Sequence, residues 1–278
     1  MKALYDQISF ESSKLITRRY STSFSLGIYF LDKRFHEPIY GIYGFVRLAD
    51  EIVDTFHQYN KRDLFDRFRD DTWRSIADGI SLNPVLNAFQ HVVNTYNVDY
   101  TSIETFLKSM EMDLQTKQYG QGEIENYILG SAEVVGLMCL RVFTEGNDDQ
   151  YNKLKPFAMA LGSAFQKINF LRDLKADYKE LGRTYFPNVD IHHFDDITKS
   201  LLEKEIEHEF NMGYEGILML PKGVRFGVYV AYVYYFALLR KIRNTPAHVI
   251  LNERVRIPNK TKYKLLFTSY LRHSFNLL

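Results

Sequence analysis

Apolar residues recur at intervals of three and four along most of the chain, which is the periodicity of amphipathic helices. Asn83-Pro84 and Asn244-Thr245-Pro246 separate some of these stretches with helix-ending signals. The run Val228–Tyr235 has strand propensity, but its length and its flanks favour a helix. The pattern therefore predicts an all-α protein, with helices over Asp63–Ile80, Pro84–Tyr96, Thr101–Tyr119, Glu123–Phe143, Tyr151–Leu181, Ile197–Leu218 and Gly223–Arg243.

The organisation of the chain favours one domain over residues 1–278. Neither an internal repeat nor a linker rich in Gly or Ser divides the 278 residues. The chain carries 20 Tyr and 21 Phe, and so many rings need either a large core or an apolar cavity. We therefore expect a single helical bundle around a central apolar cavity.

Charge and hydropathy narrow the class of partner. A formal net charge of +1, without a basic stripe, gives no reason to expect nucleic acid as a ligand. The longest apolar run, Phe226–Leu239, is too short to span a bilayer, and Met1–Tyr20 lacks the apolar centre of a signal peptide. A cytoplasmic protein is expected, with peripheral contact to the inner face of the membrane left open. Cys139, the single cysteine, is expected to be a core residue.

The segment Tyr40–Asp54 carries the first candidate for chemistry. Asp50 and Asp54 are four residues apart, so on a helix they share one face among apolar neighbours. Two carboxylates stacked in this way repel each other, and either Arg47 or a metal ion would offset the repulsion. A solvated face or an ordinary ion pair is the plainer interpretation of the same spacing.

The segment Gln166–Asp177 carries the second candidate. Asn169, Asp173 and Asp177 are spaced by four and four, which aligns three oxygen-bearing side chains on one helix face. Such oxygens suit Mg²⁺, which proteins usually hold with a few carboxylates together with substrate phosphates. Two such faces directed into one cavity would bind a diphosphate through Mg²⁺, with arginines taking the remaining phosphate charge: Arg47, Arg172 and Arg254. Salt bridges to Lys175 and Lys179 are the plainer alternative for these carboxylates.

At these residues the chain resembles the squalene/phytoene synthase family of head-to-head prenyltransferases. Tyr20-Ser-Thr-Ser-Phe24 is similar to the family's Ser-x-Ser-Phe segment, although a tyrosine stands where the family has a basic or small residue. The two aspartate-rich segments resemble the family's two metal-binding motifs, and Glu51 replaces the second Asp often found in the first. Further residues fit the family's middle and C-terminal parts: Asp113, Tyr119, Glu123, Tyr127, Gly136, Gly182-Arg183-x-Tyr185-x-Pro187, Tyr235 and Arg254.

The resemblance implies an all-α isoprenoid-synthase fold, two prenyl diphosphate substrates and Mg²⁺, with Mn²⁺ as an alternative ion. It implies metal ligation by Asp50, Asp54, Asn169, Asp173 and Asp177. It implies catalytic roles for Asp50, Asp54, Asp173, Asp177, Arg47 and Tyr43. It implies substrate contacts for Tyr20, Ser21, Ser23, Tyr43, Arg47, Asp113, Tyr127, Gln166, Arg172, Tyr235 and Arg254.

Within the family the chain looks most like bacterial phytoene synthases, which join two geranylgeranyl diphosphates without NADPH. That resemblance implies a place in carotenoid biosynthesis, with a carotenoid desaturase as downstream partner. A farnesyl-using dehydrosqualene, hydroxysqualene or squalene synthase is the alternative, and cavity depth, set by small residues such as Ala132, Gly136 and Gly162, would distinguish them. A non-catalytic relative that serves as a scaffold, and a plain helical interaction protein, are the readings from other functional classes.

Overall fold

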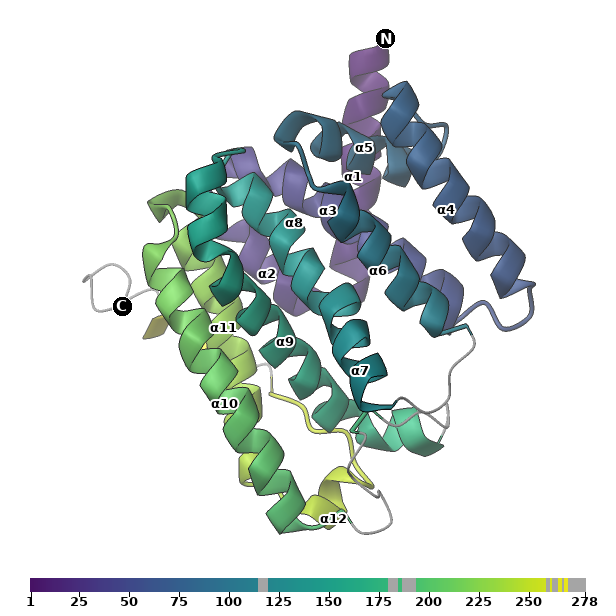
Figure 1. The fold of residues 1–278 in the computed structure, drawn as a ribbon. Helices are drawn as coiled ribbons and strands as arrows, with labels where there is room; N and C mark the ends of the chain where they lie inside the picture. The colour runs from purple at the N-terminus through teal and green to yellow at the C-terminus, as the bar shows by residue number, and fades with distance from the viewer. Residues whose placement is uncertain are drawn as a thin grey trace.

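The computed structural model describes residues 1–114, 120–179, 185–186, 194–258, 261, 265–266 and 268–269, with the backbone alone for residues 22–23, 121 and 176–179. Every regular element within these residues is a helix, which confirms the predicted all-α class (Figure 1). The helices are α1 (Lys2–Tyr20), α2 (Thr22–Tyr29), η1 (Lys33–Phe35), α3 (His36–Asp54), α4 (Lys61–Asp78), α5 (Pro84–Tyr96), α6 (Tyr100–Met112), α7 (Gln121–Ile128), η2 (Leu129–Glu133), α8 (Val134–Phe143), α9 (Asp148–Lys179), α10 (Asp196–Met219), α11 (Lys222–Arg243) and α12 (Ala247–Ile250).

Two long buried helices organise the bundle. Helix α3 packs against α1, α4, α5, α6 and α8, whereas α9 packs against α8, α10, α11 and η2. In Figure 1, α4 and α5 accordingly lie on one side of the molecule and α10 and α11 on the other, with α8 between α3 and α9. Helix α2 connects the two halves of the bundle because it packs on both α11 and α3. This arrangement sets α3 and α9 on opposite walls of one interior space.

The first helix, α1, was not predicted because its hydrophobic pattern is inverted. Its buried positions are mostly small and polar: Ser9, Ser13 and Thr17, with Phe10 as the exception. These small residues allow a close approach to α3, since a Cβ atom added to Gly44 would lie 2.7 Å from the Cβ of Ser13. The larger apolar side chains of α1 point outward instead, so the residue pattern alone does not reveal the helix.

The predicted helix over Glu123–Phe143 is interrupted by one π-helical turn at Leu129–Glu133. Such turns often mark functional sites, and here Ser131 and Ala132 of the turn line the interior cavity. The span Gly122–Phe143 is long and apolar enough to cross a membrane, but 61% of its most apolar window is buried inside the protein. That burial is the expected property of a core helix.

A half-buried acidic pair, formed by Glu133 of the π-turn and Glu209 of α10, makes stability depend on pH. Burial, and then the negative charge of Glu209 on α10, raise the pKa of Glu133 to about 7, and Lys167 on α9 opposes the shift. Lys167 also bonds Glu209 and Glu205, with nitrogen–oxygen distances of 2.6 and 2.5 Å. The folded state therefore holds the Glu133 proton more tightly than the unfolded state, and stability falls as pH rises from about 4.5 to about 7.

We expect Glu133→Gln to raise the melting temperature at pH 8 and to change it little at pH 4.5, because the substitution removes the cost of ionising this carboxyl. Thermal unfolding at the two pH values measures the effect. The matched control is Glu125→Gln on the exposed side of α7, which should be neutral at both. Equal shifts at pH 4.5 and pH 8 would contradict the assignment.

Candidate active site

One face of α3 brings an aromatic, a basic and an acidic side chain into the interior cavity. Tyr43, Arg47 and Asp50 follow one another at spacings of four and three, so they line the same wall. Burial, and then the negative charge of Asp54, raise the pKa of Asp50 well above its usual value, whereas Arg47 lowers it. The negative charges of Asp113 and Glu51 add to the rise. This end of the cavity is therefore an acidic cluster whose negative charges are only partly balanced by Arg47.

The guanidinium of Arg47 is held from several sides. It donates hydrogen bonds to the carboxylates of Asp50 and Glu51. It also lies over the ring of Tyr20, with its Cζ atom 4.2 Å from the ring centre. Its Nε–H group is buried and finds no acceptor among the residues that the structure describes. An anion entering here would find a positioned arginine with one donor unused.

The facing wall is built from α9, α11 and the segment after α12. Gln166, Asn169 and Arg172 line the cavity from α9, and Tyr235 lines it from α11. The Tyr235 hydroxyl donates to Oδ1 of Asn169 at 3.3 Å. Arg172 donates from Nε to Oδ1 of the adjacent Asp173 at 3.0 Å. Arg254 reaches the same carboxylate, with 2.7 Å between its Nε and Oδ1 of Asp173.

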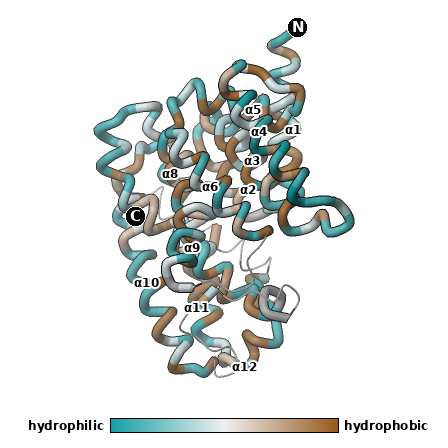
Figure 2. The backbone as a smooth tube through the Cα atoms, turned by 45° about the vertical axis from the view of Figure 1, so that its right-hand side comes forward, coloured by the Kyte–Doolittle hydropathy of each residue, from teal (hydrophilic) through white to brown (hydrophobic). Residues whose placement is uncertain are grey.

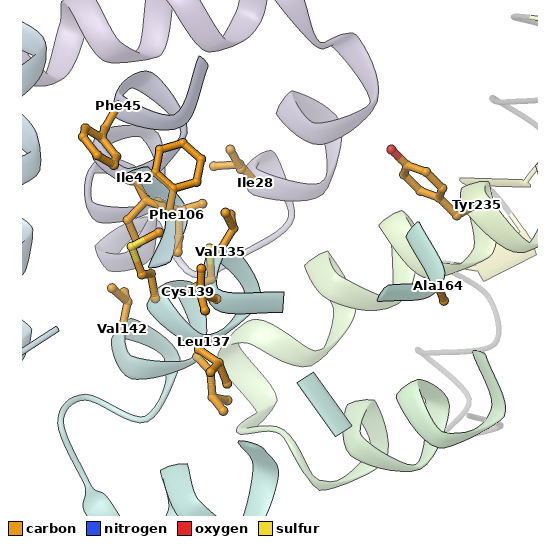
Figure 3. Close-up of a cluster of buried hydrophobic side chains, with 14 of the residues drawn as sticks. Ile28, Ile42, Phe45, Phe106, Val135, Leu137, Cys139, Val142, Ala164 and Tyr235 are labelled. Atoms are coloured by element: carbon orange, nitrogen blue, oxygen red, sulfur yellow. The ribbon is translucent and has the colours of Figure 1, made fainter. Parts of the chain in front are cut away.

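Between these walls lies a cavity of about 600 Å³. Along α9 its lining extends from Leu154 to Arg172, which is roughly 27 Å of helix. The charged residues stand at one end, and the remainder is mainly apolar. Figure 3 shows some of the lining residues, with Ile28, Phe106, Val135 and Cys139 gathered on one side and Tyr235 on the other. The shape suits a ligand with a charged head and a long apolar tail.

Four aromatic rings lie between the polar end and the apolar part of the cavity. Phe24 contacts Tyr43, with ring centres 4.7 Å apart, and lies 6.1 Å from Tyr235. Phe165 stacks on Tyr235 at 4.1 Å. All four residues line the cavity. Burial raises the pKa of both Tyr43 and Tyr235, so both hydroxyls stay protonated at neutral pH.

The donor set fits a divalent cation only in part. Carboxylate and amide oxygens are the ligands that Mg²⁺ prefers, and the crowded acidic end of α3 lacks compensating charge. Yet no group of three His, Cys, Asp or Glu side chains converges on one point among those described. Asp173 is moreover occupied by two arginines. The residues therefore fit an ion that shares its coordination with a bound phosphate better than an ion held by protein alone.

Comparison with known proteins identifies the family. The family model described as squalene/phytoene synthase matches residues 17–261, a region that includes both polar helix faces and Arg254. The chain belongs to the squalene/phytoene synthase family. The phytoene synthase of Arthrospira platensis is 26% identical over 95% of this chain and 93% of its own length. The 15-cis-phytoene synthase of Synechocystis is 26% identical over 95% of this chain and 85% of its own length.

Solved structures agree on the fold. A dehydrosqualene synthase crystallised with a ligand superposes with a TM-score of 0.82, at 23% sequence identity, and the match covers 96% of this chain and 98% of the other. The isoprenoid-synthase fold expected from the resemblance is thereby confirmed. At this level of identity the likeness concerns the fold and carries no conclusion about substrate.

Most of the residues that the family resemblance singles out meet in this one cavity. Those that line it are Tyr20, Ser21, Tyr43, Arg47, Asp50, Tyr127, Gln166, Asn169, Arg172, Tyr235 and Arg254. Asp54, Asp113 and Asp173 are not among the lining residues. Asp113 is buried and accepts a hydrogen bond of 2.9 Å from the Tyr127 hydroxyl. The side chains of Ser23 and Asp177 lie outside the described residues, as do Tyr119 and most of Gly182–Pro187.

Two features of the site were not foreseen from the family motifs. Ser21 acts as the N-cap of α2, because its hydroxyl accepts from the backbone N–H of Phe24 at 3.3 Å. Gly136 and Gly162, proposed to set cavity depth, line the cavity and also allow helices to touch. A Cβ atom on Gly162 would lie 2.8 Å from the carbonyl oxygen of Ala132, and one on Gly136 would lie 3.1 Å from that of Ala158. A larger residue at either position would press on the facing backbone, so its effect on chain length would include a shift of α9.

Proposed function

We propose that this protein is a phytoene synthase, a Mg²⁺-dependent prenyltransferase that joins two geranylgeranyl diphosphates head to head. The observation that carries the proposal is the pairing of the polar faces of α3 and α9 at one end of a long, aromatic-lined cavity. The similarity to phytoene synthases over nearly the whole chain supports it. The reaction takes place in two stages, each with loss of one diphosphate and one proton.

The polar end would bind the two diphosphates. Arg47, Arg172 and Arg254 supply the cationic donors, with Ser21, Gln166 and Tyr235 beside them. Asp50, Asp54, Asn169, Asp173 and Asp177 would hold the metal ions. When bound, Mg²⁺ supplies positive charge that stabilises the departing diphosphate. In this arrangement Arg172 and Arg254 would release the Asp173 carboxylate and bond phosphate oxygens instead. The Asp173 carboxylate would then be available to the cation.

The apolar part of the cavity would carry the carbon chemistry. Breaking the C–O bond of one substrate leaves an allylic cation, which the faces of Phe24, Tyr43, Phe165 and Tyr235 can stabilise. The double bond of the second substrate attacks, and proton loss gives a cyclopropyl diphosphate. Breaking of the second C–O bond, rearrangement and a second proton loss then give phytoene. Burial raises the pKa of Tyr43 and Tyr235 and disfavours their phenolate forms, which supports the released diphosphate as the base.

A second candidate is a synthase that joins two farnesyl diphosphates. The observation in its favour is the similarity to the 4,4'-diapophytoene synthase of Staphylococcus haemolyticus, which is 25% identical over 64% of this chain and 62% of its own length. Purified protein with Mg²⁺ and geranylgeranyl diphosphate, without NADPH, should release a forty-carbon hydrocarbon with a triene at its centre. Asp50→Asn is the matched inactive control. A thirty-carbon product from farnesyl diphosphate, with none from geranylgeranyl diphosphate, would replace the proposal by this candidate.

Chain length should respond to a side chain in the tail-binding part of the cavity. Ala158 lines the cavity one turn from Leu154 and far along α9 from Arg172. We expect Ala158→Phe to lower kcat/KM for geranylgeranyl diphosphate at least tenfold relative to farnesyl diphosphate, because the ring occupies space needed by the longer tail. Ala158→Ser is the control. An unchanged ratio of the two kcat/KM values would show that the tail does not reach this position.

Tyr20 should act by positioning Arg47. Its ring lies beneath the guanidinium, and its hydroxyl bonds the Glu51 carboxylate that holds the same arginine. We expect Tyr20→Leu to raise KM for the diphosphate by roughly threefold to tenfold, with a smaller change in kcat. Tyr20→Phe keeps the ring and should stay near the parent value. A Phe variant as impaired as the Leu variant would assign the effect to the hydroxyl.

A further inference from the structure

The outward face of α1 combines exposed apolar side chains with exposed basic ones. Leu4, Ile8 and Leu15 fall within one narrow sector of the helix and are 59%, 46% and 58% exposed. Lys14, Arg18 and Arg19 flank this sector and are also exposed. These six residues are called the α1 outer face below. In Figure 2 hydrophilic and hydrophobic positions accordingly alternate along α1 at the top of the molecule.

A neighbouring loop carries a further exposed apolar side chain close to α1. The Tyr5 hydroxyl donates to the carbonyl oxygen of Ser81 at 2.7 Å, which fixes the loop between α4 and α5 against α1. Leu82, the next residue, is 97% exposed. Leu82 has almost its whole side chain in water and lies beside a helix with three more exposed apolar side chains. Exposed apolar groups of this kind mark a surface that contacts another molecule.

Helix α1 is net positive because its four basic residues, Lys2, Lys14, Arg18 and Arg19, outnumber its two acidic ones, Asp6 and Glu11. Lys2 pairs with Asp6 at 2.9 Å, and Gln7 donates to Glu11 at 3.0 Å. Lys14, Arg18 and Arg19 lie nearer the C-terminal end of the helix. The same end forms part of the cavity lining on its inner side, through Thr17, Tyr20 and Ser21. The basic part of the outer face therefore lies next to the polar end of the active-site cavity.

We propose that the α1 outer face docks the protein on an anionic lipid bilayer. An amphipathic helix with leucine and isoleucine on one sector and basic residues beside it is suited to the headgroup region of such a membrane. A second copy of this chain fits less well in a twofold contact with parallel α1 helices, because that contact would bring Lys14, Arg18 and Arg19 of both copies together. The proposal rests on the proposed function for its purpose, since substrate tail and product are both lipids.

Sedimentation with vesicles tests the docking directly. The parent protein should bind phosphatidylglycerol-containing vesicles and bind pure phosphatidylcholine vesicles at least tenfold more weakly. Arg18→Gln/Arg19→Gln should weaken binding to anionic vesicles roughly tenfold, and Leu4→Ser/Ile8→Ser/Leu15→Ser should abolish it. The matched control is Ile197→Ser/Leu201→Ser, an exposed apolar pair on α10 that is 72% and 62% exposed, and it should bind like the parent.

Two further measurements separate the possible failures. Circular dichroism and gel filtration should show that the triple α1 variant is folded and has the parent's oligomeric state. A dimer that only this variant disrupts, or vesicle binding that it retains, would overturn the docking proposal. With substrate in detergent the triple variant should keep the parent's turnover. Vesicle binding without turnover in the parent would refute the proposed function alone, and turnover without vesicle binding would refute the docking alone.

Discussion

Replacing Asp50 with Asn should abolish product formation and at the same time make the protein more stable. The carboxylate lies in the cavity wall, where burial and the charges of Asp54, Asp113 and Glu51 oppose its ionisation. Asn has nearly the same shape, so it removes a crowded negative charge without leaving a hole. Turnover should fall by about 10²–10³-fold or more, because the variant lacks a carboxylate proposed to hold the cation that stabilises the departing diphosphate.

Both halves of this expectation are measurable on the same sample. Melting curves recorded with a chelator should show a higher transition temperature for Asp50→Asn than for the parent. Addition of Mg²⁺ with inorganic diphosphate should stabilise the parent and should stabilise the variant much less. Glu51→Gln is the control, because Glu51 bonds Arg47 and Thr55 rather than facing the cavity. A variant that loses stability together with turnover would mean that Asp50 serves the fold.

Gly227→Ala should loosen the contact between α11 and α2. A Cβ atom at this position would lie 2.4 Å from Cδ2 of Leu31 and 2.6 Å from the carbonyl oxygen of Gly27. Backbone cannot yield by a rotamer change, so the helices must separate. We expect a loss of about 1–3 kcal/mol in the free energy of unfolding. Turnover should also fall, because α11 carries Tyr235 and α2 carries Phe24.

Chemical denaturation of the variant measures this loss. The matched control is Gly122→Ala in α7, where a Cβ atom meets nothing within 4 Å. In the control, alanine should stabilise the helix by up to about 1 kcal/mol, because glycine is the poorer helix former. If both substitutions were neutral, the close approach of α11 to α2 would not contribute to stability.

The sequence predicted helices well where burial followed hydrophobicity. The segment at Pro84–Tyr96 begins and ends where the periodic pattern does, since Pro84 starts it and Asn97 ends it in a left-handed conformation. The segment at Glu123–Phe143 was predicted as one helix, and its π-turn leaves no mark in the spacing of apolar residues. Helix α1 was missed because small polar residues form its contact with α3. Contacts made by small residues carry no hydrophobic signal.

The site was predictable to the extent that it follows helix periodicity. Spacings of four predicted that Asp50 shares a helix face with Asp54, and Asn169 with Asp173. Asp50 and Asn169 line the cavity, whereas Asp54 and Asp173 are not among its lining residues. Residue spacing could not predict the contacts between distant segments. The stacking of Phe165 on Tyr235 and the contact of Arg254 with Asp173 depend on how α9, α11 and the C-terminal segment pack. The inverted hydrophobic pattern of α1, with small polar residues buried and apolar residues exposed, is likewise visible only in the fold.

We propose that one cavity accepts two twenty-carbon tails with their diphosphates at the polar end. The most direct test offers the purified protein an equimolar mixture of geranylgeranyl and farnesyl diphosphate with Mg²⁺, followed by mass analysis of the hydrocarbon products. We expect forty-carbon phytoene to predominate and Asp50→Asn to make none. A predominance of thirty-carbon product, or no hydrocarbon from either substrate, would contradict it.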